Sequence, residues 1–65
     1  MITFNADEVF EMAEQIERNG AAFYRKAAEN FRGLDLSKVL LDLAAMEDDH
    51  ERTFHAMRTE LPPKL

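Results

Sequence analysis

The chain has 65 residues, of which 46% are hydrophobic and 32% charged, proportions typical of a folded soluble domain rather than a disordered segment. It contains no cysteine, which excludes disulfides, thiolate metal sites and a thiol nucleophile. The formal net charge is −5 and no basic stripe is present, so we expect no binding to nucleic acid.

The short length limits how the chain can be stabilised. Small domains bury a small share of their surface, so without disulfides a bound metal or a partner chain remains the available means. The N-terminal residues 1–5 lack the basic and apolar regions of a signal peptide, and no apolar run approaches the roughly 20 residues that a membrane helix requires. We therefore expect a cytoplasmic protein that does not bind membranes.

The first predicted helix runs from about residue 6 to about residue 32. Asn5 and Glu8 form a capping box at its start, in which Asn5 accepts from the Glu8 amide and Glu8 reaches back to the Asn5 backbone. Gly33 ends it, because glycine readily adopts the positive φ that reverses a chain after a helix.

A second helix is predicted from about residue 36 to about residue 60, after a turn at about residues 33–35. Asp35 or Ser37 is the expected cap, and the pair Pro62-Pro63 stops the helix. The whole chain, 1–65, is thus predicted to be a single all-α unit, an antiparallel two-helix hairpin.

Each predicted helix carries a run of residues at alternating steps of 3 and 4, the spacing of a bundle seam. The first seam comprises Phe10, Ala13, Glu17, Gly20, Tyr24, Ala27 and Phe31, and the second comprises Leu36, Leu40, Leu43, Glu47, His50, Phe54, Met57 and Leu61. Val9, Ile16 and Phe23 are expected to widen the buried face of the first helix. Both seams are apolar except near their midpoints, where ionisable groups interrupt them.

These ionisable groups, Glu17, Glu47 and His50, are predicted to lie at one level of the hairpin. Glu17 precedes Gly33 by 16 residues, and the other two follow it by 14 and 17. At about 1.5 Å per residue all three lie roughly 21–26 Å from the turn. A buried carboxylate is strongly unfavourable unless it is paired or bound to metal, so this convergence predicts a metal site.

One hairpin cannot complete such a site, because it offers only two carboxylates and one imidazole. Two copies related by a two-fold axis would supply four glutamates and two histidines at the centre of a four-helix bundle. Carboxylate and imidazole ligands suit iron, with manganese and zinc as alternative occupants. We therefore expect a homodimer or a higher homo-oligomer that holds two iron ions per dimer.

The segments Ile16–Tyr24 and Leu43–His50 together resemble the rubrerythrin branch of the ferritin-like superfamily. The resemblance implies a ferritin-like four-helix bundle, with Glu17, Glu47 and His50 as metal ligands. It also implies that Tyr24 lies beside the metals, where a catalytic redox or proton-transfer role competes with an ordinary core role. The activity it implies is oxidation of ferrous iron, with dioxygen or peroxide as the electron acceptor.

The chain departs from that family in two ways. Members usually carry two hairpins in one chain, and rubrerythrins proper add a cysteine-ligated iron domain that delivers electrons. Here the site would be shared between two chains, and a peroxide-reducing cycle would need an external electron donor. The leading hypothesis is a non-haem di-iron carboxylate oxidoreductase, either a ferroxidase or a peroxide-reducing enzyme.

Other hypotheses remain open at this point. The chain could be an iron-binding or storage-related module of the encapsulated-ferritin type, whose single-hairpin members form larger rings. It could be a metal-free dimerisation hairpin, or the first half of a longer two-hairpin protein. Among the remaining polar residues, His55 is expected to pair with Glu51 on the surface, and a solvated acidic face is expected at Glu11, Glu14, Asp48 and Asp49.

Overall fold

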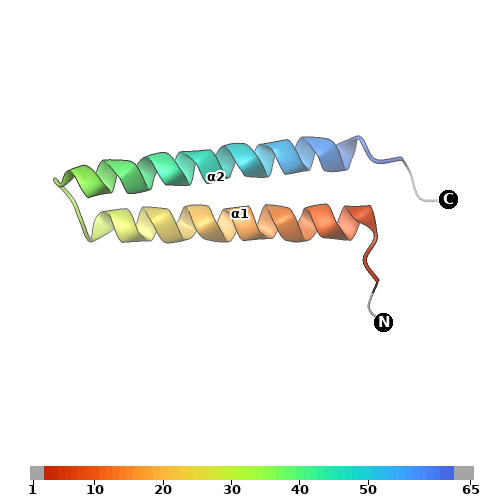
Figure 1. Cartoon of the computed structure of the whole chain (residues 1–65), viewed down its shortest axis with the longest axis horizontal. Coiled ribbons are helices and arrows are strands. Elements are labelled where there is room, and N and C mark those ends of the chain that lie inside the picture. Colours follow the sequence, from red (N-terminus) through yellow and green to blue (C-terminus); the bar gives the residue numbers. More distant parts are fainter. Residues whose placement is uncertain (1–2, 63–65) are drawn as a thin grey trace.

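The chain forms a flat hairpin of two antiparallel helices that lie side by side (Figure 1). The computed structural model describes residues 3–62, in which α1 spans Ala6–Glu29 and α2 spans Asp35–Thr59. The hairpin measures 53 × 26 × 10 Å, so it is a single layer of helices with two open faces. This confirms the predicted helical hairpin. Within residues 3–62, neither helix combines the length and hydrophobicity needed to span a bilayer.

α1 begins at a capped N-terminus. The Oδ1 atom of Asn5 accepts a hydrogen bond of 2.8 Å from the backbone N–H of Glu8, as expected for the first half of a capping box. The second half differs from the prediction, because the Glu8 carboxylate accepts from the Asn5 side-chain amide at 3.0 Å. Asp7 and Glu8 also place negative charge in the first turn, where it interacts favourably with the helix dipole.

The turn is longer than predicted, because α1 ends at Glu29, three residues earlier than expected. The N–H groups of Asn30 and Phe31 donate to carbonyls three residues back, at 3.0 and 3.1 Å, and this tighter pattern ends the α-helix. Gly33 follows with a φ of +81°, which confirms its predicted role in reversing the chain.

The predicted caps of α2 are wrong. Leu34 is the N-cap residue, in an extended conformation and with no side-chain hydrogen bond, while Asp35 is already helical. The Ser37 side chain contacts α1 instead, where its hydroxyl donates to the carbonyl of Ala28 at 3.3 Å. Pro62 follows the end of α2 as expected, and Pro63 lies outside the described residues.

The two helices meet along a line of small residues. Ala21, Ala28 and Ala44 are 2%, 3% and 1% exposed, and within residues 3–62 the only other buried residue is Glu14. The contact line in α1 therefore runs through positions 14, 21 and 28. The predicted seam of this helix lies three residues further on, at 17, 24 and 31, which is rotated by about 60°. The seams thus flank the contact between the helices instead of forming it.

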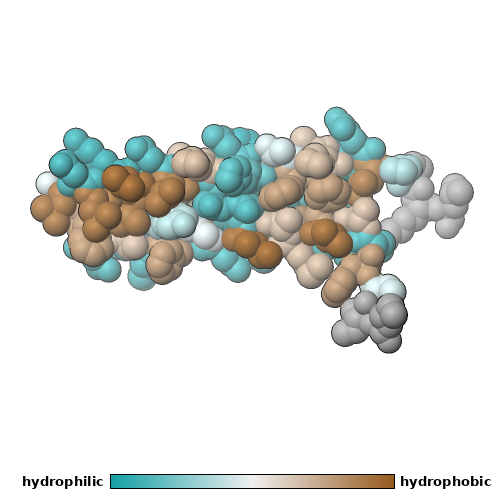
Figure 2. All heavy atoms as spheres, in the orientation of Figure 1, coloured by the Kyte–Doolittle hydropathy of each residue, from teal (hydrophilic) through white to brown (hydrophobic). Residues whose placement is uncertain are grey.

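Both seams border the same side of the hairpin, because Glu17 of α1 and His50 of α2 approach each other there. We call this side, formed by the seam residues of both helices, the apolar face. Figure 2 shows hydrophobic surface toward both ends of the hairpin, separated by a hydrophilic band at mid-length. Ile16 and Phe23, which were expected to widen the buried face, are each 66% exposed in a single hairpin.

A set of ion pairs joins the helices on the other side. Nη1 of Arg18 lies 2.6 Å from Oε2 of Glu51, and Arg25 pairs with Asp48. The hydrogen bond with Arg25 lowers the pKa of the Asp48 carboxyl, and the same bond raises the pKa of the arginine. Each pair is partly exposed, so each contributes little stability by itself. Their main effect is to favour one register of α1 against α2.

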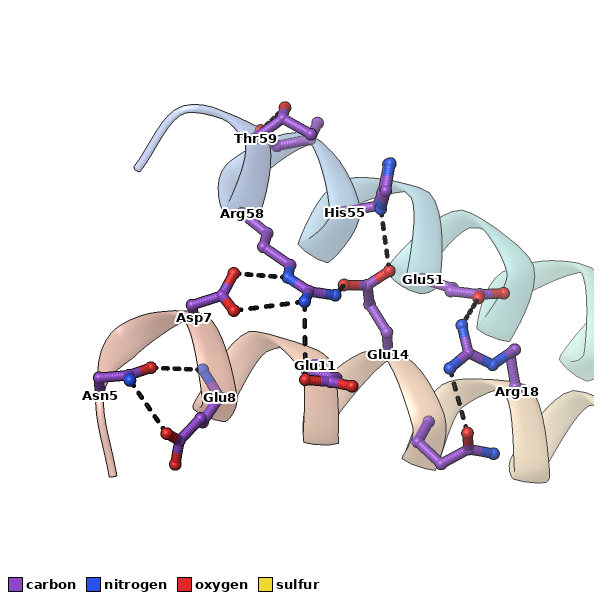
Figure 3. Close-up of polar contacts among 12 residues, drawn as sticks. Asn5, Asp7, Glu8, Glu11, Glu14, Arg18, Glu51, His55, Arg58 and Thr59 are labelled. Carbon is purple, nitrogen blue, oxygen red and sulfur yellow. Dashed lines mark hydrogen bonds and ion pairs between the residues drawn. The ribbon is translucent and has the colours of Figure 1, made fainter. Parts of the chain in front are cut away.

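A denser group of charges lies at the open end of the hairpin, opposite the turn (Figure 3). The buried carboxylate of Glu14 accepts from Nη1 of Arg58 at 3.3 Å and lies 3.0 Å from Nδ1 of His55. Arg58 also donates to Asp7 at 2.7 Å and lies 3.6 Å from Glu11. The hydrogen bond with Asp7 is the main reason that the pKa of the Arg58 guanidinium is raised. These five residues form the open-end cluster.

The open-end cluster corrects two sequence predictions. His55 pairs with Glu14 and not with Glu51, whose partner is Arg18. Glu14 is 4% exposed and does not belong to a solvated acidic face. The reason is the position of the contact line, which passes through residue 14 and places its carboxylate between the two helices.

Replacing Arg58 by methionine is expected to lower the melting midpoint by about 5–15 °C, because it leaves a buried carboxylate with one partner fewer. Arg52→Met is the matched control, since Arg52 is 71% exposed and pairs with Asp49 of its own helix. Thermal melting by circular dichroism checks this. Equal midpoints for the two variants would show that the open-end cluster does not stabilise the hairpin.

Candidate metal centre

The structure brings the three predicted ligands together. One potential ligand atom from each of Glu17, Glu47 and His50 lies within 4.8 Å of the other two. Nδ1 of His50 lies 3.3 Å from Oε2 of Glu17, across the two helices. Among residues 3–62, this is the one group of three or more acidic, histidine or cysteine side chains with such spacing.

Helix geometry explains the convergence. Glu47 and His50 are three residues apart, about one turn, so they project from the same side of α2. Glu17 reaches the same point from α1, because the hairpin reverses at Gly33 with nearly equal numbers of residues on either side. Glu47 is also midway between Asp35 and Thr59, and Glu17 is within one residue of the midpoint of α1. The site therefore lies at mid-length, at the level of the hydrophilic band in Figure 2.

The donor set fits a cation. Two carboxylates that share a small site repel each other unless a proton or a cation compensates them. The imidazole of His50 adds a nitrogen lone pair, and with no thiolate present the set suits iron, manganese or zinc. The Glu17 side chain is 16% exposed and that of His50 is 53% exposed, so the group opens onto the apolar face. Further ligands would have to come from water or from a second chain on that face.

Tyr24 is not joined to the cluster in a single hairpin. Within residues 3–62 its hydroxyl forms no hydrogen bond with any of the three candidate ligands, and its ring packs edge-on against Phe23 with centroids 5.6 Å apart. It lies two turns from Glu17, about 10 Å along the axis of α1. Its catalytic role therefore stays a prediction.

Sequence reasoning missed the residues that hold the site in register. Arg18, Asp48 and Glu51 each directly follow one of the three candidate ligands. Adjacent positions on a helix differ by about 100°, so a ligand on one face has its successor near the other. These successors form the ion pairs of Arg18 with Glu51 and of Asp48 with Arg25 on the reverse side. The sequence did contain a signal for these pairs. Basic Arg18 directly follows the ligand in α1, and acidic Asp48 and Glu51 directly follow the two ligands in α2, so opposite charges lie at the level of the site.

Neither a protein-family model, nor a curated protein, nor a solved structure matches this chain. The resemblance to rubrerythrins therefore depends on the motif residues, and the candidate metal centre on the geometry of Glu17, Glu47 and His50.

Proposed function

We propose that two copies of this chain form a non-haem di-iron carboxylate centre that oxidises ferrous iron, with dioxygen or peroxide as the electron acceptor. The observation that carries the proposal is the meeting of Glu17, Glu47 and His50 from two helices within 4.8 Å. A pair of hairpins would supply four carboxylates, whose charge balances that of two divalent ions. The bound iron supplies the redox chemistry.

The apolar face supports a second copy as the partner. This face carries exposed apolar surface on both sides of the hydrophilic band, and apolar patches on a protein surface are often association sites. Three large residues of the seams are 37–46% exposed there, namely Phe31, Leu36 and Met57. Covering this face would also remove water from around the half-exposed His50 and so strengthen the attraction between the carboxylates and a bound cation.

The charge distribution favours antiparallel pairing of the two hairpins. Residues 18–47, the half that includes the turn, carry five basic and four acidic side chains, a net charge of +1. The chain as a whole carries −5, so the other half carries a net charge of −6. When the turn of one copy lies over the open end of the other, each −6 half faces a +1 half instead of its like. Because the site is at mid-length, a two-fold axis through it superimposes the apolar faces over their full length.

The protein's own side chains have separate tasks in this proposal. Glu17 and Glu47 bind and neutralise the cations, and His50 binds through a ring nitrogen that must be unprotonated. Tyr24 is proposed to lie near the metals only when the partner chain is in place.

The absence of cysteine in the sequence favours iron binding or storage as a second candidate function. The chain contains no cysteine-ligated centre that could return electrons to the site after each oxidation. Under this alternative, the site takes up and oxidises one load of iron and then passes it on. Oxidation that stops after two ions per dimer would indicate this function, whereas continued turnover would indicate a ferroxidase.

Stopped-flow oxidation of anaerobically added ferrous iron tests the proposal. We expect ferric absorbance to develop on mixing with dioxygen or hydrogen peroxide. The rate should fall about tenfold or more in Glu17→Gln, Glu47→Gln and His50→Ala, as expected when metal ligands are removed. Glu11→Gln is the control, because Glu11 is 62% exposed and lies in the open-end cluster. Ligand variants that oxidise iron as fast as the wild type would contradict the proposal.

A further inference from the structure

Gly20 lies against one of the candidate ligands. It is in the interior of α1, three residues after Glu17, and it is half-buried. A Cβ atom placed on it would lie 3.3 Å from Oε2 of Glu47 and 3.5 Å from both Cδ and Cγ of the same residue. The Glu47 side chain thus lies along the surface of α1 where any other residue would carry its own side chain.

Two explanations of this glycine are possible in principle, and the contacts separate them. Glycine is among the poorest helix formers, so its place inside a helix calls for a reason. A close approach of the two backbones is not the reason, because the three atoms nearest to the added Cβ all belong to the Glu47 side chain. The helices instead meet at alanines, Ala21, Ala28 and Ala44. The space at position 20 is occupied by the Glu47 carboxylate.

We propose that Gly20 is a positioning residue of the metal site, which leaves room for the Glu47 carboxylate to reach across to α1 and share cations with Glu17. This inference rests on the proposed metal site. A contact of 3.3 Å is tight for a Cβ, so an alanine would shift the carboxylate by a few tenths of an ångström. A larger side chain would displace it further and separate it from Glu17.

Metal affinity and stability of the metal-free protein are expected to change in opposite directions. Alanine is a better helix former than glycine, so Gly20→Ala should melt at the same temperature as the wild type or higher when metal is absent. Its affinity for Mn²⁺ should nevertheless fall about 3–10-fold, and that of Gly20→Val about 10–100-fold, the range for groups that support metal ligands. A merely structural role for Gly20 would not separate the two quantities.

Calorimetric titration of the full chain with Mn²⁺ under anaerobic conditions tests this, alongside melting curves without metal. Asn19→Ala is the matched control, because it raises helix propensity at the neighbouring, exposed position and is expected to leave the affinity unchanged. Wild-type affinity in both Gly20→Ala and Gly20→Val would overturn the inference and leave the metal site standing. A wild-type protein that binds no Mn²⁺ and no Fe²⁺ would overturn both. Gly20→Ala alone decides the matter if the valine variant does not fold.

Discussion

Ferrous iron added without oxygen is expected to raise the melting midpoint of the wild-type protein by about 10–20 °C at saturating concentrations. In the metal-free dimer four glutamates would crowd one site that is partly shielded from water, and their repulsion opposes folding. Cations would bind the proposed assembled site and not the unfolded chain, so their binding would stabilise the folded dimer. Scanning calorimetry at a fixed protein concentration, with and without iron, measures the shift.

The ligand variants sharpen this expectation. Glu17→Ala and His50→Ala should lose most of the iron-dependent shift. Glu17→Ala should also melt higher than the wild type without metal, because two of the four repelling charges in the dimer are gone. Glu11→Ala, at an exposed position, should keep the shift. An unchanged midpoint in the wild type on adding iron would be incompatible with the proposed site. Variants that stay dimeric and gain stability, in a protein whose wild type binds no iron, would favour the metal-free dimerisation hairpin.

The second large effect concerns the apolar face, where Leu36→Lys is expected to weaken dimerisation about 100-fold or more. Leu36 begins the seam that continues through Leu40 and Leu43 to Glu47, so its side chain would be buried against the second copy. A lysine there would place an unpaired charge in an apolar interface. Each tenfold change in the dissociation constant corresponds to about 1.4 kcal/mol. A 100-fold weaker dimer therefore requires only a modest loss of association free energy.

Leu41→Lys is a closely matched control for Leu36→Lys. The two leucines are 46% and 49% exposed in the hairpin, so they differ in face and not in accessibility. Leu41 lines a shallow groove with Arg25 and Arg32, away from the candidate metal centre. Sedimentation equilibrium of both variants compares the faces directly. If Leu41→Lys dissociates the protein and Leu36→Lys does not, the partner covers the opposite side from the one proposed.

Residue counting was enough to predict the level of the site. The two helices, the reversal at Gly33 and the meeting of Glu17 with Glu47 and His50 follow from a breaker near the middle of the chain and ionisable residues at equal distances from it. Small errors in the helix ends did not disturb this result. The early end of α1 at Glu29 depends on the hydrogen bonding of its last turn, which composition does not reveal.

The rotation of each helix about its axis was not predictable in the same way. The apolar arc of α1 is wide, since it includes buried Ala21, the seam residue Tyr24 and the exposed Phe23. Periodicity identifies such an arc but does not indicate which edge faces the other helix of the chain and which faces a second copy. The predicted seam of α1 therefore does not coincide with its contact line to α2, and Glu14 and His55 were assigned the wrong surroundings. The network at Arg58 likewise depends on which side chains of α1 face α2.

Metal content measured together with mass in solution tests the central claim most directly. Protein incubated with ferrous iron under anaerobic conditions and then desalted should contain two iron ions for every two chains. Its particle mass should be twice the chain mass of 7.5 kDa, or a larger even multiple of it. Glu47→Ala should retain the dimer and lose the iron. A monomeric protein that carries no metal after this treatment would contradict the account.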